Sequence, residues 1–388
     1  MTKPIHEYVP DYIRQIAPYV PGRPIEEVER ELKISAIKLA SNENALGPSP
    51  LAVEAGKKAL AQANRYPDGS GFYLRHALAK KHDIPIEQII LGAGTTELID
   101  LTARLLLRPT DAGVSSYGSF PLYYITVRAS GARLIEVPLR DYHFDLDAIA
   151  RILSPETKLV FLANPNNPTG TMFTADEFDA FLSRVPPHVF IVLDEAYCDY
   201  IERADYSRSV ELVRRRGNLM VLRTFSKVYG LAGLRIGYGL GPAKFLDEMN
   251  KIRGPFNTSS VAQAAALAAL DDHKHIRRSI DSNNEGLQQL ADGMKALGVH
   301  CVPSVANFIL AEFGYDTEPL CEELTKLGVI VRPMRWMGFP QALRVSVGTR
   351  AENDKFLSAL ADLHASFAVP PSRSAQRPGR ETKTHKKG

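Results

Sequence analysis

Short apolar runs separated by longer polar stretches dominate the first two thirds of the chain. Four of these runs are typical of buried strands, at 89–91, 159–162, 190–193 and 219–222. Each is followed by a turn and then by a helix-like pattern, and this alternation predicts an α/β fold with a mostly parallel sheet covered by helices. Because such sheets bind ligands at the carboxyl ends of their strands, we expect the chemistry just after these runs.

The pattern changes near residue 255. An alanine-rich helix is predicted over 261–270, followed by a long polar helix and by short strands near 307–312 and 343–347. These elements predict a smaller α+β domain over 255–369, after a large ligand-binding domain over 41–254. Residues 370–388 are rich in Pro, Arg, Lys, Ser and Thr, so we expect a disordered basic tail, more plausibly a solvated segment than a binding arm.

Composition excludes several classes of protein. The 388 residues are 45% hydrophobic and 23% charged, as in an ordinary globular protein, and the net charge of +3 is too small to indicate nucleic acid or a membrane as the main partner. Cys198, Cys301 and Cys321 are widely spaced, which predicts no disulfide framework, no metal site and a reducing, cytoplasmic location. We find neither the apolar core of a signal peptide nor a run of about 18 apolar residues.

Lys227 occupies an unusual position for a lysine. It follows the apolar run 219–222 and precedes a glycine-rich stretch at 230–238, so we expect its amine to be partly buried. A desolvated lysine loses its preference for the charged form and becomes a nucleophile that forms Schiff bases with carbonyl groups. Most lysines are solvated surface charges, so this interpretation depends on the neighbouring motifs.

Two polar motifs follow the buried strands. The segment NPNNPTG at 164–170 is either a rigid turn or a means of aiming the Asn167 amide at a ligand. Asp194 directly follows the run 190–193, where an isolated carboxylate is costly unless it is paired, so we expect a positively charged partner. Tyr197 would stand beside the same ligand. A helix cap or a structural ion pair is the alternative for Asp194.

A third motif predicts an anion site. Gly94, Thr95 and Thr96 precede an amphipathic helix, and free amides and hydroxyls at a helix N-terminus bind phosphate. A glycine turn before a helix is weak support by itself. Arg235, eight residues beyond Lys227, would add a bidentate cation.

Together these groups match pyridoxal 5'-phosphate (PLP), which has an aldehyde, a ring nitrogen, a 3'-oxygen and a phosphate to bind. At this point the chain resembles the histidinol-phosphate aminotransferase branch of the class I/II, fold-type I PLP-dependent aminotransferases. The resemblance covers roughly residues 10 to 365, and implies an N-terminal arm and joining segment over 1–40. Its motifs are PYVPG at 18–22, LASNEN at 39–44, YPDG at 66–69, NPNNPTG at 164–170, DEAY at 194–197, TFSK at 224–227 and LRVSVGT at 343–349.

The resemblance implies a role for each cofactor residue. Lys227 would carry the covalent link, Asp194 would keep the ring nitrogen protonated, and Asn167 and Tyr197 would bind the 3'-oxygen. The remaining cofactor contacts would come from Gly94, Thr95, Thr96, Thr224, Ser226 and Arg235 around the phosphate, and from Phe120 against the ring. Two departures stand out: no proline precedes Phe120, so that Tyr117 is an alternative, and Thr96 replaces an acidic residue often found in this branch.

The resemblance also implies a homodimer, in which Tyr66 reaches the neighbouring subunit's cofactor phosphate. From composition alone, a tyrosine buried in its own turn is equally plausible at this position. Arg344 resembles the arginine that binds the anionic group of the substrate, with Arg332 as a second cation. Tyr19 and Asn44 would line the substrate side.

The activity implied is transamination between histidinol phosphate and 2-oxoglutarate, in histidine biosynthesis. Three alternatives stay open: an aromatic amino-acid aminotransferase, a PLP-dependent decarboxylase of a phosphorylated amino acid, and a non-catalytic ligand-sensing regulator.

Overall fold

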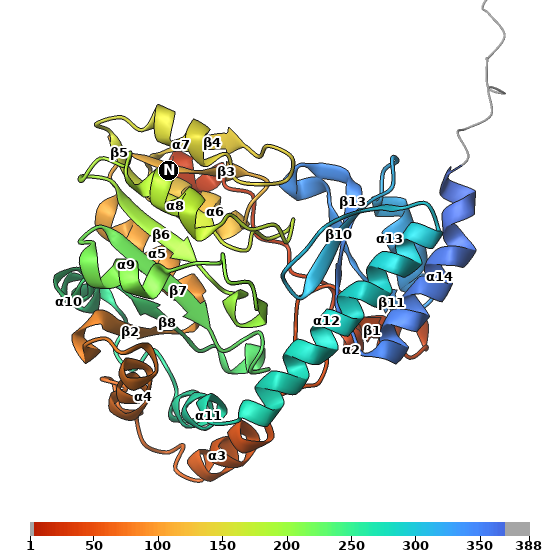
Figure 1. The fold of residues 1–388 in the computed structure, drawn as a ribbon, viewed down its shortest axis with the longest axis horizontal. Helices are drawn as coiled ribbons and strands as arrows, with labels where there is room; N and C mark the ends of the chain where they lie inside the picture. Colours follow the sequence, from red (N-terminus) through yellow and green to blue (C-terminus); the bar gives the residue numbers. More distant parts are fainter. Residues whose placement is uncertain (1–3, 369–388) are drawn as a thin grey trace, which may run out of the picture.

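The computed structural model describes residues 4–368, which form two domains side by side (Figure 1). Within these residues the large domain contains a 7-stranded sheet of order β2-β8-β7-β6-β5-β3-β4. β8 is antiparallel to both of its neighbours and every other pair is parallel, which confirms the predicted α/β class. The strands are β2 (Ile89–Gly92), β3 (Ala112–Tyr117), β4 (Arg133–Pro138), β5 (Thr157–Ala163), β6 (Phe190–Asp194), β7 (Leu219–Thr224) and β8 (Gly237–Leu240).

The four predicted strands are β2, β5, β6 and β7, which lie in the middle of the sheet or next to β8. Their side chains are buried on both faces, which is why they appear as continuous apolar runs. Three strands of this sheet were not predicted. β3 has the sequence AGVSSY, which is too polar to form a run, and the edge strand β4 is mostly half-buried. β8 has the glycine-rich sequence GYGL.

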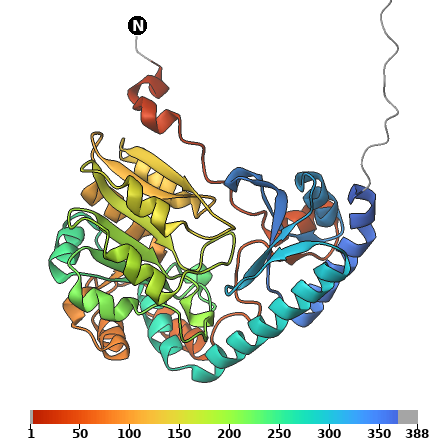
Figure 2. The ribbon, with the colours of Figure 1, turned by 45° about the horizontal axis from the view of Figure 1, so that its top comes forward.

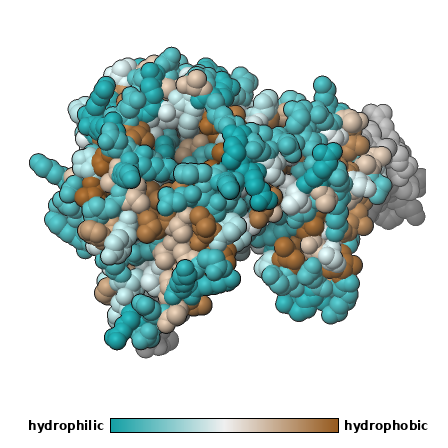
Figure 3. Space-filling view, turned by 60° about the horizontal axis from the view of Figure 1, so that its bottom comes forward, coloured by the Kyte–Doolittle hydropathy of each residue, from teal (hydrophilic) through white to brown (hydrophobic). Residues whose placement is uncertain are grey.

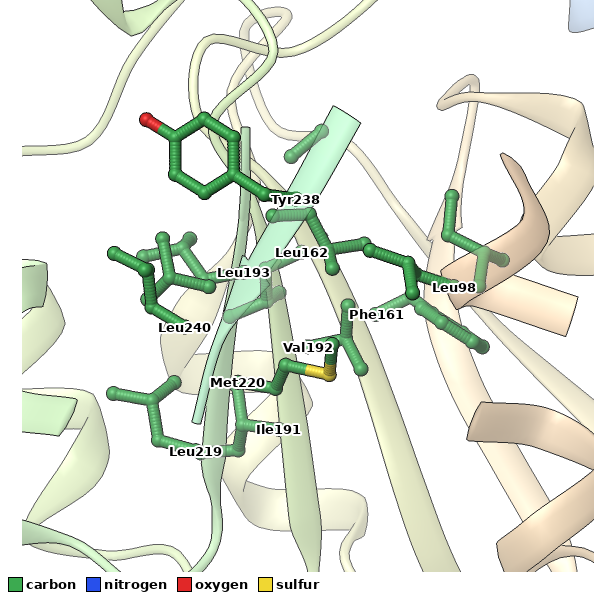
Figure 4. Close-up of a cluster of buried hydrophobic side chains, with 14 of the residues drawn as sticks. Leu98, Phe161, Leu162, Ile191, Val192, Leu193, Leu219, Met220, Tyr238 and Leu240 are labelled. Atoms are coloured by element: carbon green, nitrogen blue, oxygen red, sulfur yellow. The ribbon is translucent and has the colours of Figure 1, made fainter. Parts of the chain in front are cut away.

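The centre of the large domain is a close-packed cluster from β5, β6 and β7, joined by Leu98 of α5 and Leu240 of β8 (Figure 4). Gly239 of β8 makes this packing possible, because a Cβ atom there would lie 2.2 Å from the Cε atom of Met220. The sheet is therefore a rigid support for the loops that follow its strands.

Helices lie on both faces of this sheet (Figure 1). They are α3 (Pro50–Leu60), α4 (Phe72–His82), α5 (Gly94–Leu106), α6 (Pro121–Ala129), α7 (Leu146–Ile152), α8 (Ala175–Leu182), α9 (Ser209–Arg215), α10 (Ala243–Ile252) and α11 (Ser260–Leu270). α11 is the alanine-rich helix that the sequence assigned to the small domain. The structure instead packs it on α3, where Gly56 and the alanines of α11 allow a close approach, and its buried residues belong to the large core.

The small domain has a 4-stranded antiparallel sheet of order β12-β13-β10-β9 within the described residues. Its strands are β9 (His300–Val302), β10 (Phe308–Glu312), β12 (Arg332–Met334) and β13 (Phe339–Ser346), and its helices are α12 (His273–Ala296), α13 (Glu318–Lys326) and α14 (Arg350–Ala368). α12 runs from the large domain along the small one (Figure 1).

The N-terminal segment crosses from one domain to the other (Figure 2). α1 (Asp11–Arg14) packs on α6, whereas β1 (Ile37–Lys38), which follows α2 (Ile25–Leu32), pairs with β11 (Val329–Ile330) of the small domain. The residues between α1 and α2 therefore pass between the domains, where the sequence motif PYVPG lies.

Several predictions concern other parts of the chain. The tail at 370–388 lies outside the described residues. Among residues 4–368, no helix combines the length and apolarity needed to cross a bilayer. Cys198, Cys301 and Cys321 are all unpaired.

On the side where α3 and α11 lie, apolar patches reach the surface between hydrophilic ones (Figure 3).

Candidate active site

A cavity of about 380 Å³ lies at the carboxyl ends of the central strands. Ala163, Asp194 and Thr224, the last residues of β5, β6 and β7, line it from the large domain, and Arg332 and Arg344 line it from the small domain. The cavity thus lies where parallel strands end, the place at which we expect a ligand to bind. The sequence-predicted residues that line this cavity are Tyr19, Gly94, Thr95, Thr96, Phe120, Asn167, Asp194, Tyr197, Thr224, Ser226, Lys227, Arg235, Arg332 and Arg344.

The Lys227 amine is half-buried and faces this cavity. Its Nζ atom donates to the main-chain oxygen of Asn42 at 3.1 Å and lies 5.3 Å from the ring centroid of Tyr197. Burial, with the nearby Arg344 and Arg235 cations, lowers the pKa of Lys227 to about 8. A substantial fraction of this amine is therefore neutral in mildly alkaline solution, which is the form that attacks a carbonyl group.

The Asp194 carboxylate lies at the floor of the cavity and is 5% exposed. It accepts hydrogen bonds from the Tyr123 hydroxyl at 2.8 Å and from the Ala196 amide at 3.0 Å. The expected cationic partner is absent: within residues 4–368, no Lys, Arg or His forms an ion pair with Asp194. Burial accordingly raises the pKa of Asp194 to about 6. The carboxylate is thus ready for a cation that a ligand would bring.

Tyr197 and Asn167 hold polar groups above this floor. The Tyr197 hydroxyl accepts from the Asn42 side-chain amide at 3.0 Å, and burial raises the pKa of Tyr197 to about 12. The Asn167 side-chain oxygen accepts from Arg344 at 2.5 Å. This contact leaves the NH2 group of Asn167 to donate to a ligand.

Small and hydroxyl-bearing residues gather with Arg235 at the start of α5. Gly94 has φ of +72°, and a Cβ atom there would lie 2.7 Å from the Arg235 guanidinium, so that this glycine lets the cation approach the helix N-terminus. The Thr224 hydroxyl donates to the Ser226 hydroxyl at 3.0 Å. A helix N-terminus with a guanidinium and hydroxyl groups is suited to a phosphate.

Two arginines face each other at the other end of the cavity. Arg332 of β12 pairs directly with Arg344 of β13 in the antiparallel register. Both are buried, at 8% and 7% exposed, and within the described residues neither forms a salt bridge. Burial lowers the pKa of Arg332, and that of Arg344 to about 10. Like charges in this arrangement repel each other, so the pair favours an anionic ligand.

Neutral contacts hold these two guanidinium groups in place. Arg332 donates to the Val20 carbonyl and stacks over Trp336, with 4.9 Å between the guanidinium carbon and the ring centroid. Tyr19 packs edge-on against the same tryptophan. Arg344 donates to the Ala40 carbonyl at 2.7 Å, and its Nε atom is buried without a partner in the described structure.

Two predicted site residues do not line this cavity. Asn44 was predicted to bind substrate, but its amide donates to the Val228 carbonyl at 2.8 Å and to the Ser279 hydroxyl at 2.9 Å. The loop therefore turns Asn44 toward α12, and Asn42 lines the cavity instead. Tyr66 is 82% exposed and stacks on Phe256, so it is neither buried in its own turn nor part of the cavity of its own chain.

Sequence reasoning missed Asn42, Glu43 and Tyr123, which also line the cavity. Asn42 belongs to a recognised motif, but its contacts lie more than 150 residues away along the chain. Tyr123 lies in a helix and carries no local signal. Phe120, and not the alternative Tyr117, faces the cavity.

The family model for aminotransferase class I and II matches residues 34–360 of this chain. The chain belongs to the class I and II aminotransferase family. This aminotransferase is 48% identical to a histidinol-phosphate aminotransferase of Anaeromyxobacter over 355 aligned residues. The alignment covers 91% of this chain and 98% of that protein. It is 46% identical to histidinol-phosphate aminotransferase 1 of Nitrosococcus oceani, with 90% and 94% covered.

Solved structures show the same fold for this aminotransferase. Histidinol-phosphate aminotransferase from Sinorhizobium meliloti, solved in complex with PLP, superposes with a TM-score of 0.86 at 30% identity, covering 92% of this chain and 97% of that one. A double mutant of Thermus thermophilus aspartate aminotransferase superposes with a TM-score of 0.80 at 24% identity, over 92% and 99% of the two chains.

Proposed function

We propose that this aminotransferase uses PLP to transfer the amino group of histidinol phosphate to 2-oxoglutarate, giving imidazole acetol phosphate and glutamate. The paired arginines Arg332 and Arg344 are the observation that supports this choice of substrate. Two buried, opposed cations without an acidic partner in the described structure favour a phosphate ester in one half-reaction and a carboxylate in the other. The chain is 48% and 46% identical to two histidinol-phosphate aminotransferases over nine tenths of its length, which supports the same substrate.

The residues of the cavity fit PLP group by group. The buried Asp194 carboxylate accepts two hydrogen bonds and meets no cation among residues 4–368, so it suits a protonated ring nitrogen. Phe120 would cover the ring, Asn167 and Tyr197 would donate to the 3'-oxygen, and Gly94, Thr95, Thr96, Thr224, Ser226 and Arg235 would surround the phosphate. When bound, PLP supplies an electron-withdrawing ring that stabilises the charge left after a proton is removed from the amine-bearing carbon.

The protein's own contribution is to bind, orient and move protons. Lys227 would carry the covalent link to the cofactor, and its amine, once released by the substrate, would take the proton as a base and return it as an acid. Its lowered pKa suits this exchange, because a base works best when its pKa lies near the working pH. Arg332 and Arg344 would hold the anionic end of either substrate and so fix the reacting carbon beside Lys227.

A substrate panel with a Lys227→Ala control tests this function. We expect steady transamination with histidinol phosphate, slower reaction with phenylalanine, no carbon dioxide release and no shift of DNA in a gel. Lys227→Ala should lose turnover and the visible absorbance of bound PLP, and borohydride should trap no adduct at this position. Faster reaction with phenylalanine would favour an aromatic aminotransferase, and release of carbon dioxide without 2-oxoglutarate a decarboxylase.

We also propose a homodimer with shared sites, in the cytoplasm. Tyr66, Phe72, Tyr73 and Phe256 are 82%, 51%, 74% and 47% exposed, which is unusual for a group of aromatic side chains near one another in the fold. A second copy that covers them would bring its Tyr66 toward the phosphate end of the neighbouring cavity. The three unpaired cysteines are compatible with a reducing compartment.

A further inference from the structure

Asn42 lies at the centre of a hydrogen-bond network that joins the two domains. It is 1% exposed and has φ of +55°, a left-handed conformation that asparagine adopts more readily than most residues. Its contacts reach Tyr197, Lys227 and Ser346, which come from three other parts of the chain. The motif LASNEN contains this residue, but the sequence assigned no role to it.

The orientation of the Asn42 side-chain amide is set by Ser346. The Ser346 hydroxyl oxygen accepts from the Asn42 main-chain N–H at 2.8 Å, and its single proton is donated to Asn42 Oδ1 at 2.9 Å. Because Oδ1 faces Ser346, Nδ2 must face the Tyr197 hydroxyl, 3.0 Å away. A rotated amide would place Nδ2 against Ser346, and the Ser346 proton would lose the acceptor that Oδ1 provides.

This orientation determines where the Tyr197 proton points. The phenol oxygen accepts from Asn42, so its own O–H must be directed away from Asn42, and the phenol lines the cavity. We propose that Asn42 is a positioning residue that holds the Tyr197 hydroxyl as a hydrogen-bond donor toward the cavity, where the 3'-oxygen of PLP would accept it. This inference rests on the proposed function.

The same residue connects the substrate end of the site to the reactive amine. Ser346 lies two residues after Arg344 on β13, and the Asn307 amide donates to the Asn42 main-chain oxygen at 3.0 Å. That oxygen also accepts from Lys227 at 3.1 Å. Ser346 of β13 and Asn307, which directly precedes β10, thus hold the loop that orients two groups of the large domain.

Two substitutions separate positioning from simple packing. Asn42→Gly removes the amide without strain, because glycine adopts positive φ freely. Asn42→Asp keeps the shape, but its carboxylate can only accept a hydrogen bond and draws the Tyr197 O–H away from the cavity. We expect the PLP dissociation constant to rise about 5- to 10-fold for Asn42→Gly and further for Asn42→Asp. The apparent pKa obtained from the pH titration of the visible absorbance should also change, less for Asn42→Gly and more for Asn42→Asp.

The Tyr197→Phe variant tests whether Asn42 acts through the Tyr197 hydroxyl. If Asn42 acts through the phenol, Asn42→Gly should change neither the dissociation constant nor the titration further in the Tyr197→Phe protein. The charged and titratable groups around the phenol, Arg344, Asp194, Tyr19 and Lys227, are unchanged in every variant. Ser346→Ala, which frees the amide to rotate, should give a smaller shift of the same sign.

Thermal unfolding of each protein without PLP shows whether the variants fold. A milder effect of Asn42→Asp than of Asn42→Gly, or additive effects of Asn42→Gly and Tyr197→Phe, would overturn this inference alone. A wild-type protein that develops no visible absorbance with PLP would overturn the proposed function itself.

Discussion

Several residues of this site lie where burial lowers the stability of the folded protein and increases the reactivity of the side chain. Asp194 is the clearest case, because its carboxylate is buried with hydrogen bonds but no ion pair in the described structure. Its pKa rises from 3.8 to about 6, so the folded protein binds this proton more tightly than the unfolded chain. Stability from this group is therefore present in full below pH 3.8 and is lost as the pH rises through about 6.

Asp194→Asn should stabilise the protein without PLP above that range. Removing a buried charge whose pKa is raised by about two units is worth on the order of 3 kcal/mol at neutral pH. Thermal unfolding of variant and wild type should give equal midpoints near pH 3.8 and a higher midpoint for the variant above pH 6. An advantage of the same size at both ends of the range would show that the carboxylate charge is not its source.

The paired arginines give a second prediction at this scale. Arg332→Gln removes one cation and keeps a hydrogen-bond donor for the Val20 carbonyl. We expect kcat/KM to fall about 100-fold or more for histidinol phosphate, because a charge-assisted phosphate contact is lost, and much less for histidinol without its phosphate. Equal losses with both amines would argue against phosphate binding by Arg332.

At the scale of single elements, the start of α5 illustrates how backbone conformation prepares a site. Gly94 combines positive φ with the close approach of Arg235. Gly94→Ala would strain the backbone and displace the guanidinium, so we expect about tenfold weaker binding of PLP, measured by equilibrium titration. Gly298→Ala is the matched control, since Gly298 also has positive φ, at +77°, and a Cβ atom there would meet nothing within 4 Å. A comparable loss in the control would contradict this account.

The elements of the central sheet were predictable because both faces of β5, β6 and β7 are buried, so burial appears directly as apolar runs. The residues after them could be assigned to a site for the same reason. β3 was not predictable, because its two serines interrupt the apolar run although both are buried; Ser115 donates to the Phe161 carbonyl. Asn42 and Tyr123 were missed since their partners are remote in sequence. Asn44 was misplaced because a local motif does not show which way a loop turns.

At the scale of the whole molecule, the proposed dimer predicts that two inactive variants regain activity when they are mixed. Lys227→Ala and Tyr66→Ala proteins should each have little activity alone, but mixed dimers would contain one site with both native residues. Random mixing in equal amounts should restore about a quarter of wild-type activity, since half of the dimers carry one intact site of two. Lys227→Ala mixed with Asp194→Asn should restore none, because both residues of a site come from one chain.

Trp336 is the single tryptophan of the chain, and it stacks on Arg332 beside the cavity. Its fluorescence is therefore a natural signal from the anion-binding end of the site. Histidinol phosphate that engages Arg332 should change the emission even in Lys227→Ala, where no turnover obscures the equilibrium. The protein thus carries its own optical reporter, and occupancy by substrate can be followed without a label.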